Sequence, residues 1–154
     1  MSSCPCGLGN DYASCCQKYI DGVENAPTAE ALMRSRFSAY ALSKVPYVIA
    51  TCHPNLRKQQ NPADLMRWCQ TSEFKRLEIM EKVAGNENDE QGRVRFIAWI
   101  KENDKLQPLH EFSDFEKVEG KWTYKSGQHQ KTKMPGPNTS CPCGSGKKFK
   151  KCCG

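Results

Sequence analysis

Apolar side chains recur at a helical spacing in the stretch that follows residue 26. They are Met33, Phe37, Tyr40, Ala41 and Val48. Pro27 and Thr28 are typical of a helix start, and Glu30 falls in the first turn, where an acidic side chain is favourable. A long helix is therefore predicted to begin at this point.

Two further helices are predicted before residue 71. Pro46 is expected to break or kink the first helix and to begin a second short one, which ends near residues 53–54. Asn61 as a cap and Pro62 in the first turn predict a third helix over residues 61–69.

After residue 76 the pattern changes to a period of two, which is typical of strands with one buried face. Apolar residues on one face of two successive strands are Leu77, Ile79 and Val83, and then Val94, Phe96, Ala98 and Ile100. The second strand alternates these against Arg95, Ile97 and Trp99. Residues 107–118 and 121–126 are predicted to form two more strands, joined by a tight turn at 119–121. Helices followed by an antiparallel meander predict an α+β domain.

The chain carries the same cysteine pattern near both of its ends. Residues 4–16 and 141–153 share the spacing C-P-C-G-x-G-x-x-(aromatic)-x-x-C-C, and eight of the ten cysteines belong to it. The glycines can take positive φ, so the backbone can turn sharply around clustered sulfurs. The two cysteines outside the repeats, Cys52 and Cys69, are expected to be small buried hydrophobic side chains.

Four cysteines at this spacing suit Zn²⁺, which favours tetrahedral coordination. In structural zinc sites, four thiolates can fill the whole coordination shell. We therefore expect two zinc ions per chain, each with a structural rather than a catalytic role. The expected ligands are Cys4, Cys6, Cys15 and Cys16 in the first site and Cys141, Cys143, Cys152 and Cys153 in the second. The alternatives that the spacing leaves open are a pair of disulfides in each repeat and cysteines without any partner.

The formal net charge of +6 invites a nucleic-acid interpretation. Eight thiolates and two Zn²⁺ ions would reduce that charge to +2, however, so most of the basicity belongs to the metal sites. An asymmetry remains, because eight lysines and no acidic residues follow residue 120. Four of them replace polar or small residues of the first repeat, and they are Lys147, Lys148, Lys150 and Lys151.

No segment approaches the roughly 20 apolar residues that are needed to span a bilayer. The first residues also lack the basic and apolar regions of a secretory signal. We therefore expect a cytoplasmic protein without a membrane partner, in a compartment where clustered thiols favour metal over disulfides.

The stretch "CPCGSGKKFKKCC" resembles the SEC-C zinc-binding motif, known from the C-terminal tail of the bacterial preprotein translocase motor. In that setting the motif is a docking surface for a secretion chaperone. The N-terminal repeat is similar but diverged, because Leu8, Gly9, Asn10 and Asp11 replace the basic core.

Further segments extend the resemblance to the YchJ family over the whole chain. They are "LMRSRFSAYALSKVPYVIATCHP", "FIAWI" and "HEFSDFEKVEGKWTY". The family implies a middle domain similar to nuclear-transport-factor-2-like domains, in which helices pack on a strongly curved antiparallel sheet. The expected fold is thus an α+β cone with a four-stranded sheet, flanked by two small Cys₄ zinc knuckles. The expected parts are an N-terminal knuckle (1–22), the central domain (26–126), a polar linker (127–140) and a C-terminal knuckle (141–154).

A cone of this kind can hold a pocket, and its candidate polar groups are Arg36, His110 and Asp114. Strand alternation places His110 and Asp114 on one face of their strand and Glu111 on the other. If that face points inward, the histidine could act as a general base that the aspartate orients. The alternative is that both residues face solvent or satisfy buried backbone groups.

Three classes of function follow. The first is a non-catalytic zinc module that docks a protein with an acidic surface through Lys147, Lys148, Lys150 and Lys151. The second is an enzyme or small-ligand carrier that uses the cone. The third is nucleic-acid binding through the terminal lysines together with Lys131 and Lys133, although stacking aromatic residues near them are limited to Phe149.

Overall fold

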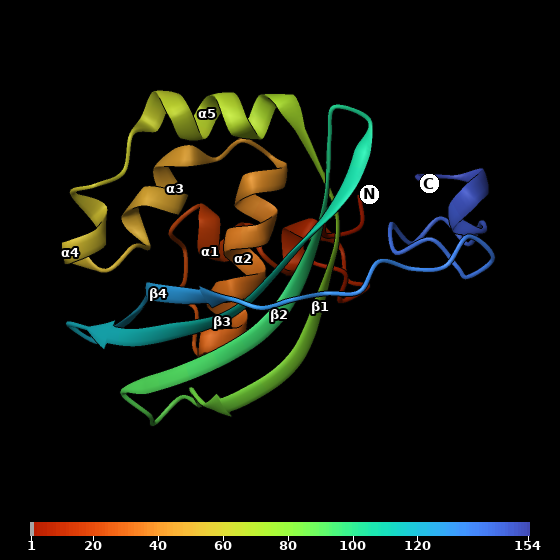
Figure 1. The fold of residues 1–154 in the computed structure, drawn as a ribbon. Coiled ribbons are helices and arrows are strands. Elements are labelled where there is room, and N and C mark those ends of the chain that lie inside the picture. The colour runs from red at the N-terminus through yellow and green to blue at the C-terminus, as the bar shows by residue number, and fades with distance from the viewer. Residues whose placement is uncertain (1) are drawn as a thin grey trace.

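The computed structural model describes residues 2–154, in which helices precede a four-stranded sheet (Figure 1). The helices are α1 (Gln17–Ile20), α2 (Ala29–Ala41), α3 (Val45–Ala50), α4 (Pro54–Arg57) and α5 (Pro62–Thr71). The strands are β1 (Ser72–Ala84), β2 (Gln91–Glu102), β3 (Lys105–Val118) and β4 (Lys121–His129). Two short 3₁₀ helices, η1 (Tyr12–Ser14) and η2 (Phe149–Lys151), lie in the two cysteine repeats.

The helix starts follow the residues that predicted them. Thr28 caps α2, since its hydroxyl accepts a hydrogen bond from the Ala31 amide at 3.0 Å. Asn61 caps α5 in the same way, with the Asp64 amide at 3.1 Å. Pro46 lies in the first turn of α3, where its missing N–H costs nothing.

The helix expected to end near residues 53–54 ends earlier, at Ala50. Cys52 forms an isolated bridge with Tyr124 of β4, and the His53 amide donates to the Tyr124 carbonyl at 2.8 Å. This pairing with the sheet draws the chain away from α3, so that Pro54 begins the new helix α4.

The sheet is an antiparallel meander in the order β1-β2-β3-β4. The register shifts between Phe74 and Arg76 and between Ile79 and Glu81 in β1, and again after Asp114 in β3. Such bulges bend strands, and the sheet curves around the helices (Figure 1). The predicted fold class, helices on a curved four-stranded antiparallel sheet, is confirmed.

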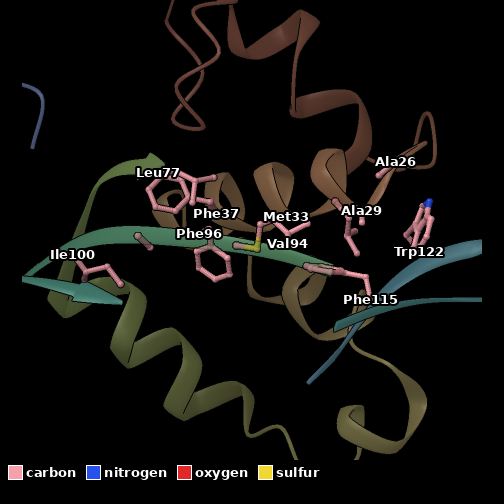
Figure 2. Close-up of a cluster of buried hydrophobic side chains, with 12 residues drawn as sticks. Ala26, Ala29, Met33, Phe37, Leu77, Val94, Phe96, Ile100, Phe115 and Trp122 are labelled. Carbon is pink, nitrogen blue, oxygen red and sulfur yellow. The ribbon is translucent and has the colours of Figure 1, made fainter. Parts of the chain in front are cut away.

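The main core lies between α2 and the concave face of the sheet. Phe37 and Phe115 are 2% and 1% exposed, and each such ring contributes about 1.5–3 kcal/mol by its burial. Figure 2 shows the side chains of α2 and of the sheet pointing toward one another. The predicted inner face of β2 is confirmed, and its members are Val94, Phe96, Ala98 and Ile100.

Candidate metal centres and a buried cavity

The N-terminal repeat brings four cysteine sulfurs together. The ligand atoms of Cys4, Cys6, Cys15 and Cys16 all lie within 4.8 Å of one another, and all four residues are buried. The Sγ atoms of Cys6 and Cys15 are 3.6 Å apart. Zn–S bonds of about 2.3 Å in a tetrahedron require S···S distances of about 3.8 Å. The cluster therefore has the dimensions of a closed tetrahedral metal site.

The C-terminal repeat forms a second cluster with the same dimensions. Its cysteines are Cys141, Cys143, Cys152 and Cys153, whose ligand atoms also lie within 4.8 Å of one another. The Sγ atom of Cys152 is 3.5 Å from that of Cys143 and 3.8 Å from that of Cys153. Each cluster can hold one metal ion.

The backbone around the two clusters is nearly identical. The amide of Cys4 donates to the Asn10 carbonyl at 2.8 Å, and the amide of Cys141 donates to the Lys147 carbonyl at the same distance. The expected positive φ angles are also present, at Gly7, Gly9, Gly144 and Gly146. The spacing in the sequence therefore specifies one small local fold, which occurs twice.

Hydrogen bonds within each cluster favour one thiolate. Hydrogen bonding from Cys16 is the main cause that lowers the pKa of Cys6 to about 5. Burial acts to raise the pKa of Cys143, but hydrogen bonds from Ser145 and Cys141 outweigh it and lower that pKa to about 6. Burial, with the neighbouring thiols, raises the pKa of Cys15 and of Cys153 to about 12. All four thiols of a cluster could ionise together at these distances only around a cation, which a divalent metal could supply.

The N-terminal cluster packs on α2. The Sγ atom of Cys4 lies 3.4 Å from the Ser38 hydroxyl, and Arg34 donates from Nη1 to the Cys6 carbonyl at 2.9 Å. Ser38 is fully buried, so this repeat is continuous with the interior of the central domain.

The C-terminal cluster packs on the convex face of the sheet, opposite α2. Cys141 is 3% exposed and forms an apolar cluster with Ile97, Trp99 and Leu106, whereas the other three cysteines are partly exposed. This contact was not predicted from the sequence. Its signal was the pair of large apolar residues on the otherwise polar face of β2, since strands buried on both faces read as continuous apolar runs.

All four lysines of the C-terminal repeat are exposed. Within residues 2–154, none of them takes part in an ion pair. The knuckle therefore turns its cysteines toward the sheet and its lysines toward solvent.

A cavity of about 100 Å³ lies between the helices and the concave face of the sheet. Its polar residues are Arg36, Tyr40, Glu111 and Tyr124, together with Trp68. Arg36 is 4% exposed and donates from Nη1 to the Val48 carbonyl and to the Thr51 hydroxyl, each at 2.7 Å. Its guanidinium also lies over the ring of Tyr124, 4.8 Å from the ring centre.

Glu111 is 8% exposed at the same cavity. Its Oε1 atom accepts hydrogen bonds from the hydroxyls of Ser113 (2.7 Å) and Tyr124 (2.5 Å). Burial and the nearby Glu111 carboxylate raise the pKa of Tyr124, so that hydroxyl keeps its proton and donates it. Gly127 of β4 leaves the space that the carboxylate occupies.

The structure places His110 and Asp114 outside this cavity, which corrects the expectation from the sequence. His110 lies near Arg95, with Nε2 and Nη1 3.2 Å apart, and its Nδ1 is 2.8 Å from the Thr132 hydroxyl. Asp114 accepts a hydrogen bond from Nε of Arg93 at 2.8 Å. These residues share the convex face because Glu111 and the buried Ser113 and Phe115 occupy the concave one. Of the three predicted pocket residues, only Arg36 lines the cone.

The close approach at Gly127 gives a first prediction. A Cβ atom at this position would lie 1.8 Å from Glu111 Oε1, so Gly127→Ala must displace the carboxylate or the strand. We expect a loss of about 1–3 kcal/mol in the free energy of unfolding, measured by urea denaturation. Gly136→Ala is the matched control, because its Cβ would meet only Thr139 at 3.9 Å. Equal stability of the two variants would contradict the prediction.

Comparisons with known proteins agree with this architecture. A model of the YchJ middle domain, an NTF2-like domain, matches residues 28–127, and a model of the SEC-C motif matches residues 138–154. A UPF0225 protein of Geobacter sulfurreducens is 39% identical over 157 residues, which cover 98% of this chain and 97% of the relative. A UPF0225 protein of Pectobacterium carotovorum is 42% identical over 155 residues, covering 99% of this chain and 97% of that protein.

Two solved structures are similar as well. The solution structure of a SEC-C motif containing protein from Rhodopseudomonas palustris has a TM-score of 0.77 and 31% identity, covering 84% of this chain and 100% of that one. The crystal structure of a SEC-C motif containing protein from Psychrobacter arcticus has a TM-score of 0.72 and 30% identity, covering 99% and 96%. In the part of the chain that the structure describes, no helix combines the length and apolar character that membrane crossing requires.

Proposed function

This chain belongs to the YchJ family, and from that premise we propose that it is a zinc-binding protein that docks an acidic protein surface. Each cysteine cluster holds one Zn²⁺ in a structural role. The docking surface, which we call the lysine face, consists of the exposed Lys147, Lys148, Lys150 and Lys151.

The sulfur geometry supports zinc. Among residues 2–154, both clusters offer four sulfurs and no nitrogen or carboxylate ligand, which suits a soft or borderline metal rather than Mg²⁺ or Ca²⁺. Four cysteines also complete the tetrahedron, so no position remains for a catalytic water. Metal analysis of the purified chain should find two zinc ions per molecule. A value well below one would contradict the assignment.

The proposal of docking rests on four exposed lysines on a knuckle whose other side packs against the sheet. Within residues 2–154, these lysines form no ion pair. Packing against Ile97, Trp99 and Leu106 gives the lysine face a defined orientation. The resemblance of this repeat to the docking motif of the translocase motor agrees with such a use. Charge contacts of this kind accelerate association and weaken as salt rises.

Neutralising the lysine face tests the proposal. The immobilised chain would be used to capture proteins from a bacterial lysate at two salt concentrations, and the captured protein would then be purified. Replacing the four lysines by glutamine should weaken its binding about tenfold, at about 0.2–1 kcal/mol for each exposed charge pair. The loss should shrink at high salt, and the partner should present an acidic surface.

A control with the same net charge is available elsewhere on the chain. Replacing the exposed Lys44, Lys58, Lys121 and Lys125 by glutamine removes the same charge at positions that are not next to any residue of the apolar cluster under the knuckle. Equal weakening in both variants would contradict a specific lysine face. Salt-sensitive binding of generic RNA or DNA, with no captured protein, would instead favour the nucleic-acid alternative.

A further inference from the structure

The cavity in the cone is bordered by two buried ions of opposite charge that do not pair with each other. Among the described residues, neither Arg36 nor Glu111 takes part in an ion pair. Burying an ion without a counter-ion is costly, because the interior of the protein does not solvate the charge as water does. A bound molecule with polar groups for both side chains would therefore offset this cost.

Each of the two side chains has polar atoms that its protein partners do not use. The hydrogen bonds of Arg36 all start from Nη1, although a guanidinium carries five N–H donors. Both hydrogen bonds to Glu111 end at Oε1, which leaves Oε2 free. Within residues 2–154, Ser72 Oγ is the single fully enclosed side-chain polar atom without a partner. The free atoms of Arg36 and Glu111 therefore contact accessible space, and the cavity that both residues line is that space.

The remaining walls are apolar. They are formed by Met33, Phe37, Phe74, Phe96, Ala98, Ile100 and Leu109. An apolar cavity of about 150 Å³ accepts benzene, which has six carbon atoms, so the volume of about 100 Å³ here encloses about four non-hydrogen atoms. The cavity is open on one side, so one or two further atoms of a ligand can extend out of it. One end of such a molecule would contact rings and aliphatic chains, and the other end would face the two ions.

We propose that this cavity binds a small molecule of zero net charge that presents an acceptor to Arg36, a donor to Glu111 and a short apolar body to the walls. An anion would leave Glu111 repelled and unpaired, and a cation would do the same to Arg36. A primary carboxamide and a zwitterionic amino acid both carry the required pair of groups. This binding activity goes beyond the proposed docking function and depends on neither the metal nor the lysine face.

Four probes of similar size separate the possibilities. Isobutyramide and alanine are net-neutral, whereas isobutyrate and isobutylamine carry one charge each. The methyl signals of Met33, Ile100 and Leu109 would be followed by NMR during titration of the full-length chain. We expect saturable shifts for at least one neutral probe, with a Kd at least tenfold lower than for either charged probe.

Two substitutions on neighbouring positions of β3 complete the test. Glu111→Gln keeps the shape of the side chain and should weaken binding of the neutral probe at least tenfold. His110→Gln lies on the opposite face and should leave it unchanged. Absence of saturable shifts for both neutral probes, equal binding of the charged ones, or unchanged binding in Glu111→Gln would overturn the proposal.

Discussion

Replacing Cys6 by serine should remove one zinc ion per chain and strongly destabilise the protein. Cys6 is fully buried, and its cluster connects residues 2–22 to α2 through Ser38 and Arg34. Serine is a poor zinc ligand, so three buried thiols would remain without the metal that organises them. Loss of a metal belongs to the mechanisms that cost about 4–5 kcal/mol or more. Thermal unfolding followed by circular dichroism, with metal analysis of the same samples, measures both effects.

The two repeats should respond unequally to this change. Cys143→Ser should also remove one zinc ion, but with a smaller loss of stability, because its cluster is partly exposed and lies outside the main core. Cys69→Ser is the matched control, since Cys69 is 5% exposed and belongs to neither cluster. That variant should keep both zinc ions. A Cys6→Ser protein that retained two zinc ions, or was no less stable than Cys69→Ser, would show that the N-terminal cluster is not a structural metal site.

Disrupting the C-terminal cluster should uncover the convex face of the sheet. Without its metal, the knuckle loses the local fold that holds Cys141 against Ile97, Trp99 and Leu106. We therefore expect the Cys152→Ser, Cys153→Ser double variant to expose Trp99, which is 5% exposed in the intact fold. In a background with Trp68→Phe and Trp122→Phe, the emission of Trp99 should shift to the red, and its quenching by iodide should rise several-fold.

Two further measurements serve as controls for this experiment. The central domain should keep its circular dichroism spectrum, because its core lies on the concave face of the sheet. Neutralising the lysine face should leave Trp99 buried, which separates docking from the covering of the sheet. Loss of the second zinc ion without any change in the quenching of Trp99 would mean that the knuckle stays on the sheet by packing alone.

Local patterns in the sequence were sufficient to predict the two cysteine clusters and most helices and strands. The cysteine spacing was informative because a tight turn, two glycines and a second cysteine pair form a unit that needs few distant contacts. The two knuckles accordingly repeat one hydrogen-bond pattern despite their different surroundings. The caps Thr28 and Asn61 were also predictable, because a cap is an interaction over three residues.

The cavity could be predicted only in part. Alternation correctly separated His110 and Asp114 from Glu111, but it could not tell which face is concave. Polarity was misleading at this point, since the concave face carries Glu111 and Ser113 while the convex face carries Phe112. Only the pairing of β3 with β2 and β4 brings the carboxylate of Glu111 to Tyr124 and into the space left by Gly127.

The sequence by itself therefore determined the two cysteine knuckles, the order of the main helices and strands, and the residues that share each face of β2 and β3. These depend on interactions between residues close in the chain, whose geometry the backbone limits to a few choices. In β1 the prediction failed, because the register shift after Ile79 places Val83 on the convex face opposite Arg93, where it is 44% exposed, and not beside Leu77 and Ile79. Tertiary structure alone decided which face of the sheet encloses Arg36 and Glu111, and which face receives the C-terminal knuckle. Both outcomes depend on the curvature and register of strands far apart in sequence, and on apolar surfaces that become buried only when the whole domain is assembled.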